Sequence, residues 1–196
     1  MVNKPHVIII AGPNGAGKST TAPFLLKDLL GVTEFVNADV IAQGLSAFAT
    51  EAVAFQAGRI MLNRLHQLAE SRRNFAFETT LSTRSYAAFL QQLKAQGYRI
   101  HLIYLWLPSS EMSIARVAER VQSGGHYVPD EVVRRRYQRG LSNFFNLYKP
   151  LADQWRFYDN ADVEGAKLIA AGSSNQENEL ANPSLWKQLT GMYCHD

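Results

Sequence analysis

The chain has 196 residues, 46% of them apolar, so it can bury a full core, and its length favours one domain over two. A net charge of +3 is too small to indicate nucleic acid as a partner. The longest apolar stretch, "HLIYLWL", is far shorter than the ~20 residues that span a membrane. The single cysteine, Cys194, excludes an intramolecular disulfide, and the chain opens without the long apolar segment of a signal peptide. We expect a cytoplasmic protein of one domain, with a core over about residues 5–170 and a polar extension over about 171–196.

Short runs rich in β-branched and aromatic residues alternate with longer stretches whose apolar residues recur at helical spacing. The runs predict strands at residues 7–11, 34–36, 75–77, 100–107 and 155–158. Helical patterns cover residues 51–72 and residues 86–93. A third helical stretch follows Ser109, which can cap it, and a fourth runs from Pro129 to Tyr148. Such alternation requires crossover connections and therefore favours a parallel sheet with helices on both faces. The tail "GSSNQENELANPS" predicts a loop, followed by a short helix near residues 185–189.

The string "AGPNGAGKST" at residues 11–20 directly follows the first predicted strand and precedes an apolar helical stretch. Its spacing G-x-x-x-x-G-K-[ST] is that of a phosphate-binding loop, in which glycines bring successive N–H groups around phosphate oxygens. In such a loop Lys18 reaches the outer phosphates of ATP, and the Ser19 hydroxyl is a ligand of Mg²⁺. The residues expected to bind ATP are Gly12, Pro13, Asn14, Gly15, Ala16, Gly17, Lys18, Ser19 and Thr20.

These patterns together predict an α/β fold of the P-loop NTPase type, with a parallel sheet of about five strands and a helical lid. Ligands of such sheets bind beyond the carboxyl ends of the strands. Two acids stand there: Asp39 after "EFVNA" and Glu78 after "NFAF". One carboxylate can accept the proton of an attacking hydroxyl, and the other can hold a substrate or a magnesium-bound water. The alternatives are that Asp39 is only a helix N-cap and Glu78 a solvated loop residue.

Arginines crowd the stretch between residues 116 and 139, where Arg116 and Arg120 share one helical face. The glycines Gly124 and Gly125 separate this helix from a second basic one that contains Arg134, Arg135 and Arg136. Two such helices around a glycine hinge favour a lid that places guanidinium groups on a transferring phosphoryl group. The alternative is a solvated basic face. His126 at the hinge either contacts phosphate or is simply exposed.

The strings "GPNGAGKST", "NAD", "FETTL" and "RVAERVQSGGHYVPDEVVRRRY" together resemble the zeta toxin family of P-loop kinases, over roughly residues 5–170. The resemblance implies ATP-dependent phosphorylation of a hydroxyl on an amino sugar nucleotide, UDP-N-acetylglucosamine in the best-known members. It implies that Lys18 and Ser19 contact phosphate and magnesium, that Asp39 is the base and that Arg116 is a lid arginine. It also makes Glu78, with Thr79 and Thr80, a substrate contact. The sequence gives no sign of the antitoxin that blocks the true toxins.

The sequence departs from the toxins at "HYVP", where His126 stands in place of their second lid arginine. Arg120 or one of residues 134–136 must then complete the lid. We expect Lys18, Asp39, Arg116 and Arg120 to act in catalysis, and Arg136 and His126 to join the substrate contacts. Two other functions stay open: a kinase of another acceptor, such as a nucleoside, a small metabolite or an RNA end, and a nucleotide-dependent switch without acceptor chemistry.

Overall fold

The computed structural model describes residues 4–28, 32–46, 52–125, 127–162 and 164–194. Its centre is a sheet of seven strands in the order β2-β3-β1-β4-β5-β6-β7. The first five strands are parallel to one another, and the last two are antiparallel. The strands are β1 (His6–Ala11), β2 (Glu34–Val36), β3 (Phe75–Thr79), β4 (Arg99–Trp106), β5 (Gln154–Asp159), β6 (Lys167–Ser173) and β7 (Gln176–Leu180).

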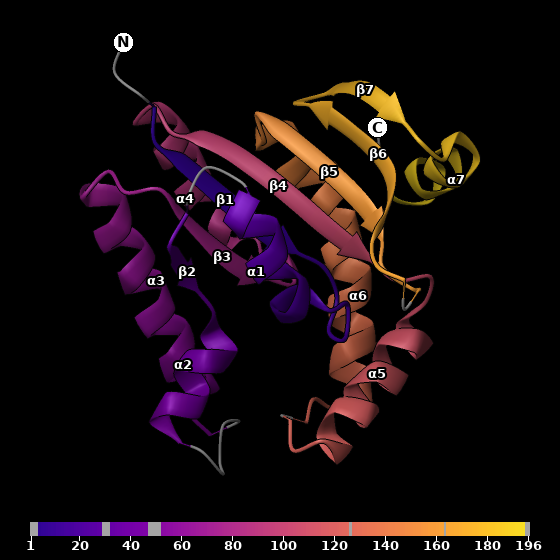
Figure 1. The fold of residues 1–196 in the computed structure, drawn as a ribbon, viewed down its shortest axis with the longest axis horizontal. Helices are drawn as coiled ribbons and strands as arrows, with labels where there is room; N and C mark the ends of the chain where they lie inside the picture. Colours follow the sequence, from indigo (N-terminus) through magenta and orange to yellow (C-terminus); the bar gives the residue numbers. More distant parts are fainter. Residues whose placement is uncertain (1–3, 29–31, 47–51, 126, 163, 195–196) are drawn as a thin grey trace.

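Helices cover both faces of this sheet, as the sequence predicts (Figure 1). One face packs against α1, and the other packs against α3, α4, α6 and α7. The central strands are therefore buried on both sides, which is why β1 is a continuous apolar run rather than an alternating one. The helices are α1 (Lys18–Asp28), α2 (Ala38–Leu45), α3 (Ala54–Glu70), α4 (Ser85–Ala95), α5 (Ser110–Gln122), α6 (Asp130–Asn143) and α7 (Pro183–Tyr193).

The C-terminal segment differs from the sequence prediction, because residues 172–180 of the expected loop are not a loop. They belong to the antiparallel hairpin β6–β7, which extends the sheet beyond β5 and raises the strand number from about five to seven. Helix α7 is also longer than predicted, and its Trp186 stacks on Trp155 of β5 with ring centroids 5.2 Å apart. The extension is thus packed against the same core as the rest of the sheet.

Helices α5 and α6 form the pair that the sequence predicts as a lid. Ser109 caps α5, as expected, by accepting a hydrogen bond from the backbone N–H of Met112. The two helices pack on one another through Val117, Val128 and Val133, and Gly124 turns the chain between them with a φ of +83°. Figure 1 shows α5 on one side of the molecule and α2 on the other. Closure of this pair over a ligand stays a prediction. No helix of the described ranges is long and apolar enough to cross a membrane.

Candidate active site

The loop between β1 and α1 is held tightly against neighbouring elements, and glycine is required at two of its positions. Gly12 has a φ of +144°, and a side chain there would overlap the carbonyl of Leu105 in β4. Gly15 has a φ of +75°, and an added Cβ would lie 2.9 Å from both the Cβ of Arg116 and the carbonyl oxygen of Ser113 in α5. Both conformations are rare for residues with a side chain. The loop is therefore shaped by β4 and α5 as well as by its own sequence.

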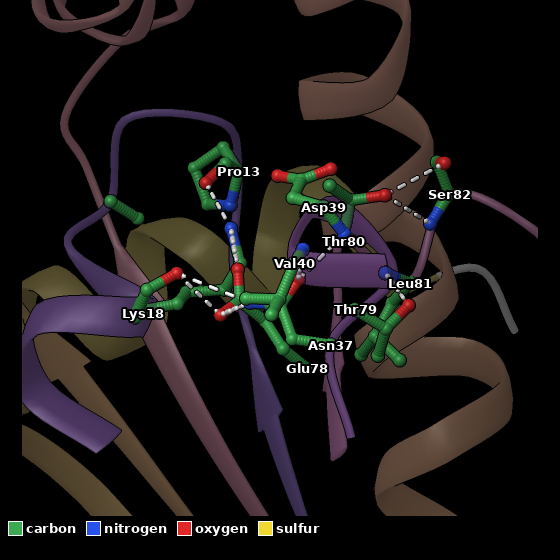
Figure 2. A network of polar contacts seen from close by, with 12 residues as sticks. Pro13, Lys18, Asn37, Asp39, Val40, Glu78, Thr79, Thr80, Leu81 and Ser82 are labelled. Carbon is green, nitrogen blue, oxygen red and sulfur yellow. Dashed lines mark hydrogen bonds and ion pairs between the residues drawn. The ribbon is translucent and has the colours of Figure 1, made fainter. Parts of the chain in front are cut away.

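Lys18 is buried at the start of α1 with 6% of its surface exposed. Its Nζ donates a hydrogen bond to the carbonyl oxygen of Pro13 at 2.8 Å and lies 3.6 Å from Oε1 of Glu78 (Figure 2). Burial lowers the pKa of Lys18, and the carboxylates of Glu78 and Asp39 partly oppose that shift. The ammonium group thus lies inside the glycine-rich loop, where a bound phosphate would meet it.

Glu78 is the acceptor of a small polar network at the end of β3. Its Oε2 accepts hydrogen bonds from Ser19 Oγ at 2.7 Å and from Asn37 Nδ2 at 2.8 Å. The strand pairs directly with β1, with Glu78 opposite Ile10, and the Glu78 side chain is only 10% exposed. The alternative that Glu78 is a solvated loop residue is therefore wrong.

Asn37 is the member of this network that the sequence analysis missed. Its Oδ1 accepts hydrogen bonds from the backbone N–H groups of Asp39 and Val40, so Asn37 is the N-cap of α2. The alternative that Asp39 is the cap is wrong; Asp39 lies in the first helical turn. The available signal was the string "NAD" after a strand, because asparagine is among the strongest N-cap residues.

A cavity of about 250 Å³ opens beside the loop, and Lys18, Asp39 and Glu78 all line it. Strand β2 is at the sheet edge, separated from β1 by β3, so Asp39 approaches from the far side of the cavity. Thr79 and Thr80 also line the cavity, and their role as substrate contacts stays a prediction. The next residue, the buried Leu81, has a φ of +55°, which is uncommon for a residue with a side chain.

The hydroxyls of the two threonines hold this turn. Thr79 Oγ1 accepts a hydrogen bond from the backbone N–H of Leu81 at 3.1 Å, and the Oγ atoms of Thr80 and Ser82 are 2.9 Å apart. Figure 2 shows this turn on the opposite side of Asp39 from Lys18. Asp39 and Glu78 thus line one cavity with Lys18, although only the strand of Glu78 neighbours β1, and the roles of the two carboxylates stay predictions.

The arginines predicted for the lid differ in what their side chains contact or approach. Arg116 donates to the carbonyl oxygens of Asn160 at 2.8 Å and Ala161 at 2.6 Å, just after β5, and the Asn160 side chain in turn donates to the carbonyl of Ala16 in the loop. Arg120 is close enough to Lys18 for its charge to lower the lysine pKa. Arg136 of α6 lines the cavity itself. His126 lies outside the described residues, and a phosphoryl role for Arg116 stays a prediction.

The oxygen atoms next to Lys18 fit a magnesium ion. Ser19 offers a hydroxyl oxygen and Glu78 a carboxylate, and these are the hard oxygen ligands that Mg²⁺ prefers. Within the described residues no group of three histidine, cysteine or acidic side chains is placed to hold a metal.

A family model described as zeta toxin matches residues 2–164 of the chain. The chain belongs to the zeta toxin family. This match confirms the resemblance. Family membership and the glycine-rich loop support the enzyme class expected from the sequence, an ATP-dependent phosphotransferase. An uncharacterised protein of Haemophilus influenzae is 31% identical over 137 residues, which cover 70% of this chain and 94% of that protein.

Two solved structures share the fold of this zeta toxin family member. AvrRxo1-ORF1:ORF2 with ATP has a TM-score of 0.74 at 19% identity and covers 96% of this chain, which spans only 64% of that one. A structure of the PezAT chromosomal toxin–antitoxin system of Streptococcus pneumoniae has a TM-score of 0.64 at 15% identity, over 97% of this chain and 84% of that one. At these identities the likeness shows a common architecture.

Proposed function

We propose that this zeta toxin family member transfers the γ-phosphoryl group of ATP to a hydroxyl of a small acceptor, and that the acceptor is a nucleotide sugar such as UDP-N-acetylglucosamine. The observation that carries the proposal is that Lys18 and Asp39 line one cavity. A cationic phosphate contact and a carboxylate base therefore face the same space. The family relation supports the acceptor class.

The residues divide the chemistry between them. Residues 12–20 cradle the phosphates of ATP, and the buried Lys18 meets the outer ones. Ser19, with Glu78 beside it, is the residue that would hold Mg²⁺, which when bound neutralises phosphate charge. The acceptor oxygen forms a bond to the γ-phosphorus as the bond from that phosphorus to ADP breaks, and Asp39 takes the hydroxyl proton. Arg120, whose charge acts on Lys18, is the arginine of α5 that would stabilise the charge that develops on the phosphoryl group.

The decisive test is a transfer assay with purified protein, ATP and Mg²⁺ against pooled nucleotide sugars, nucleosides, small metabolites and RNA ends, with products identified by mass. Asp39→Asn should lower kcat by about 10²–10⁴-fold with nearly unchanged affinity for an ATP analogue, because an amide cannot accept the proton. Asp130→Asn, an exposed acid in the first turn of α6, is the matched control. Phosphorylation of a different acceptor class in the pool would overturn the nucleotide-sugar assignment. Full activity of Asp39→Asn would refute its role as the base.

A further inference from the structure

One wall of the cavity is the turn formed by residues 79–83 at the end of β3 (Figure 2). Four of its five residues line the cavity: Thr79, Thr80, Ser82 and Thr83. The fifth, Leu81, is fully buried in the core and has a φ of +55°. Such a conformation persists in a residue with a side chain only where the surrounding structure imposes it. Neighbouring elements must therefore hold this turn in place.

Helix α6 holds the first half of the turn through backbone carbonyls. The Nδ2 of Asn143 donates a hydrogen bond to the carbonyl oxygen of Leu81 at 2.7 Å. Gly140 packs so closely on the turn that an added Cβ would lie 2.5 Å from the carbonyl oxygen of Thr80. Arg136, which lines the cavity, stands four residues before Gly140 and therefore on the same helical face. The face of α6 that lines the cavity thus also supports its turn.

Tyr148 holds the second half of the turn. Its hydroxyl donates a hydrogen bond to the carbonyl oxygen of Thr83 at 2.6 Å, and its side chain is almost completely buried. Burial raises the pKa of Tyr148 to about 12, so the hydroxyl stays protonated and remains a donor at neutral pH. Asn143 and Tyr148 therefore fix the carbonyl groups on either side of Ser82.

Asn143 and Tyr148 are five residues apart, a spacing that an α-helix does not bring to one face. In an α-helix five residues rotate by about 500°, which leaves the two side chains about 140° apart. Here α6 ends at Asn143, and residues 144–148 form a π-helix in which the N–H of Lys149 bonds to the carbonyl of Phe144, five residues earlier. Five residues then make little more than one turn, so Tyr148 returns to the face of Asn143. Such π-helical turns are rare and frequently lie at functional sites.

We propose that Asn143 and Tyr148 are positioning residues for the acceptor, and that the π-helix is the element that brings both of them onto the turn. Neither residue lines the cavity, so they act through the turn, whose hydroxyl groups face the cavity. This rests on the proposed kinase function, because it takes the turn as a wall of the acceptor site. It adds two residues outside the cavity that set acceptor affinity, and it gives the irregular end of α6 a role.

The competing explanation is that these contacts only stabilise the fold. A contact that is merely structural changes the fraction of folded protein, which lowers the apparent kcat and leaves the KM of the folded molecules unchanged. A positioning contact changes the KM for the acceptor. It should leave ATP affinity unchanged, because Gly12 and Gly15 of the phosphate-binding loop pack against β4 and α5 and not against the turn.

The experiment combines steady-state kinetics with isothermal titration of the full chain, and UDP-N-acetylglucosamine is the acceptor probe. In the titration a nonhydrolysable ATP analogue fills the phosphate-binding loop. Tyr148→Phe and Asn143→Ala should each raise the KM and the dissociation constant for the probe by about 3–10-fold, the factor expected for one hydrogen bond, with ATP affinity unchanged. Gly140→Ala, whose added Cβ would press on the carbonyl of Thr80, should have an effect at least as large.

Two variants are matched controls. Tyr98→Phe removes another buried hydroxyl that donates to a backbone carbonyl, that of Arg73 at 3.0 Å, and Tyr98 does not line the cavity. Gly58→Ala adds a Cβ inside α3, where it would meet open space. Both controls should bind the probe and ATP as the wild type does. Urea unfolding of each variant measures the loss of stability separately from the change in KM.

Three results would overturn the inference. One is unchanged probe affinity in either Tyr148→Phe or Asn143→Ala, another is an equal loss of probe affinity in Tyr98→Phe, and the third is no binding of the probe by the wild type at millimolar concentration. Failure of the kinase proposal has a different signature, because probe binding that depends on Tyr148 would persist while no phosphoryl group is transferred.

Discussion

Replacing Asn37 by alanine should destabilise the protein by about 2.5–4 kcal/mol, because its side-chain amide both caps α2 and donates a hydrogen bond to Glu78. Loss of the α2 N-cap costs about 1 kcal/mol. The hydrogen bond from Nδ2 to the Glu78 carboxylate is 2.8 Å long and joins two largely buried side chains, so its loss costs about 1.5–3 kcal/mol more. The assay is equilibrium unfolding in urea, with the free energy of unfolding compared between variants.

Asn182→Ala is the matched control, because Asn182 caps α7 through the backbone N–H of Leu185 and lies far along the chain from the cavity. It should lose only the capping energy of about 1 kcal/mol. Asn37→Asp keeps the cap and places a second carboxylate against Glu78, so it should be less stable than the wild type because two like charges are brought together. Equal losses in Asn37→Ala and Asn182→Ala would refute the stabilising contact with Glu78.

Three further predictions concern charged groups. Lys18→Ala should abolish binding of an ATP analogue, and retention of affinity by this variant would contradict the loop assignment. Because burial lowers the pKa of Lys18, the affinity of the wild type should start to fall with rising pH already below 10.5, the ordinary lysine value. Arg116→Ala should weaken ATP binding by about tenfold or more, because Arg116 holds the carbonyls after β5 that adjoin the loop; a loss confined to kcat in stopped-flow and steady-state assays would instead favour the phosphoryl role. Burial lowers the pKa values of both His6 and His101, whose ring nitrogens are 2.8 Å apart, so the unfolded chain binds more protons just below pH 6.5 and stability should fall on acidification. Urea midpoints of wild type and His101→Gln across pH would test this, and an equal acid loss in both would count against the pair.

The parts of the site that directly follow a strand could be predicted from the sequence, because the strand itself is recognisable and the site residues come next in the chain. A glycine-rich loop after a buried strand is visible in a string of ten letters, and Glu78 lies where a parallel strand ends. Asn37 could be expected as a cap but not as a partner of Glu78, because that contact depends on β2 lying beside β3. Strand order comes from long-range packing, which local periodicity does not encode.

The hairpin β6–β7 could not be predicted from the sequence for a different reason. Strand β7 reads "QENEL" and is exposed on both faces, so it shows none of the alternation by which half-buried strands are recognised. Its position is fixed by pairing with β6, where Gly172 lies opposite Glu177 and an added Cβ on Gly172 would overlap the carbonyl oxygen of Gln176. A strand without an apolar face can be predicted only when its neighbour is already known.

The hydrogen bond from the Asn160 side chain to the carbonyl of Ala16 has a consequence for synthesis in the cell. It joins the phosphate-binding loop to a residue 144 positions later in the chain. At about 5–20 residues per second, the ribosome needs roughly 7–30 s to make the intervening segment. During that time the loop lacks one of its supports, and β4, whose backbone packs against Gly12, is also translated only after the loop. A nascent chain should therefore bind ATP with full affinity only after Asn160 has emerged from the ribosome, well after the loop itself has been made.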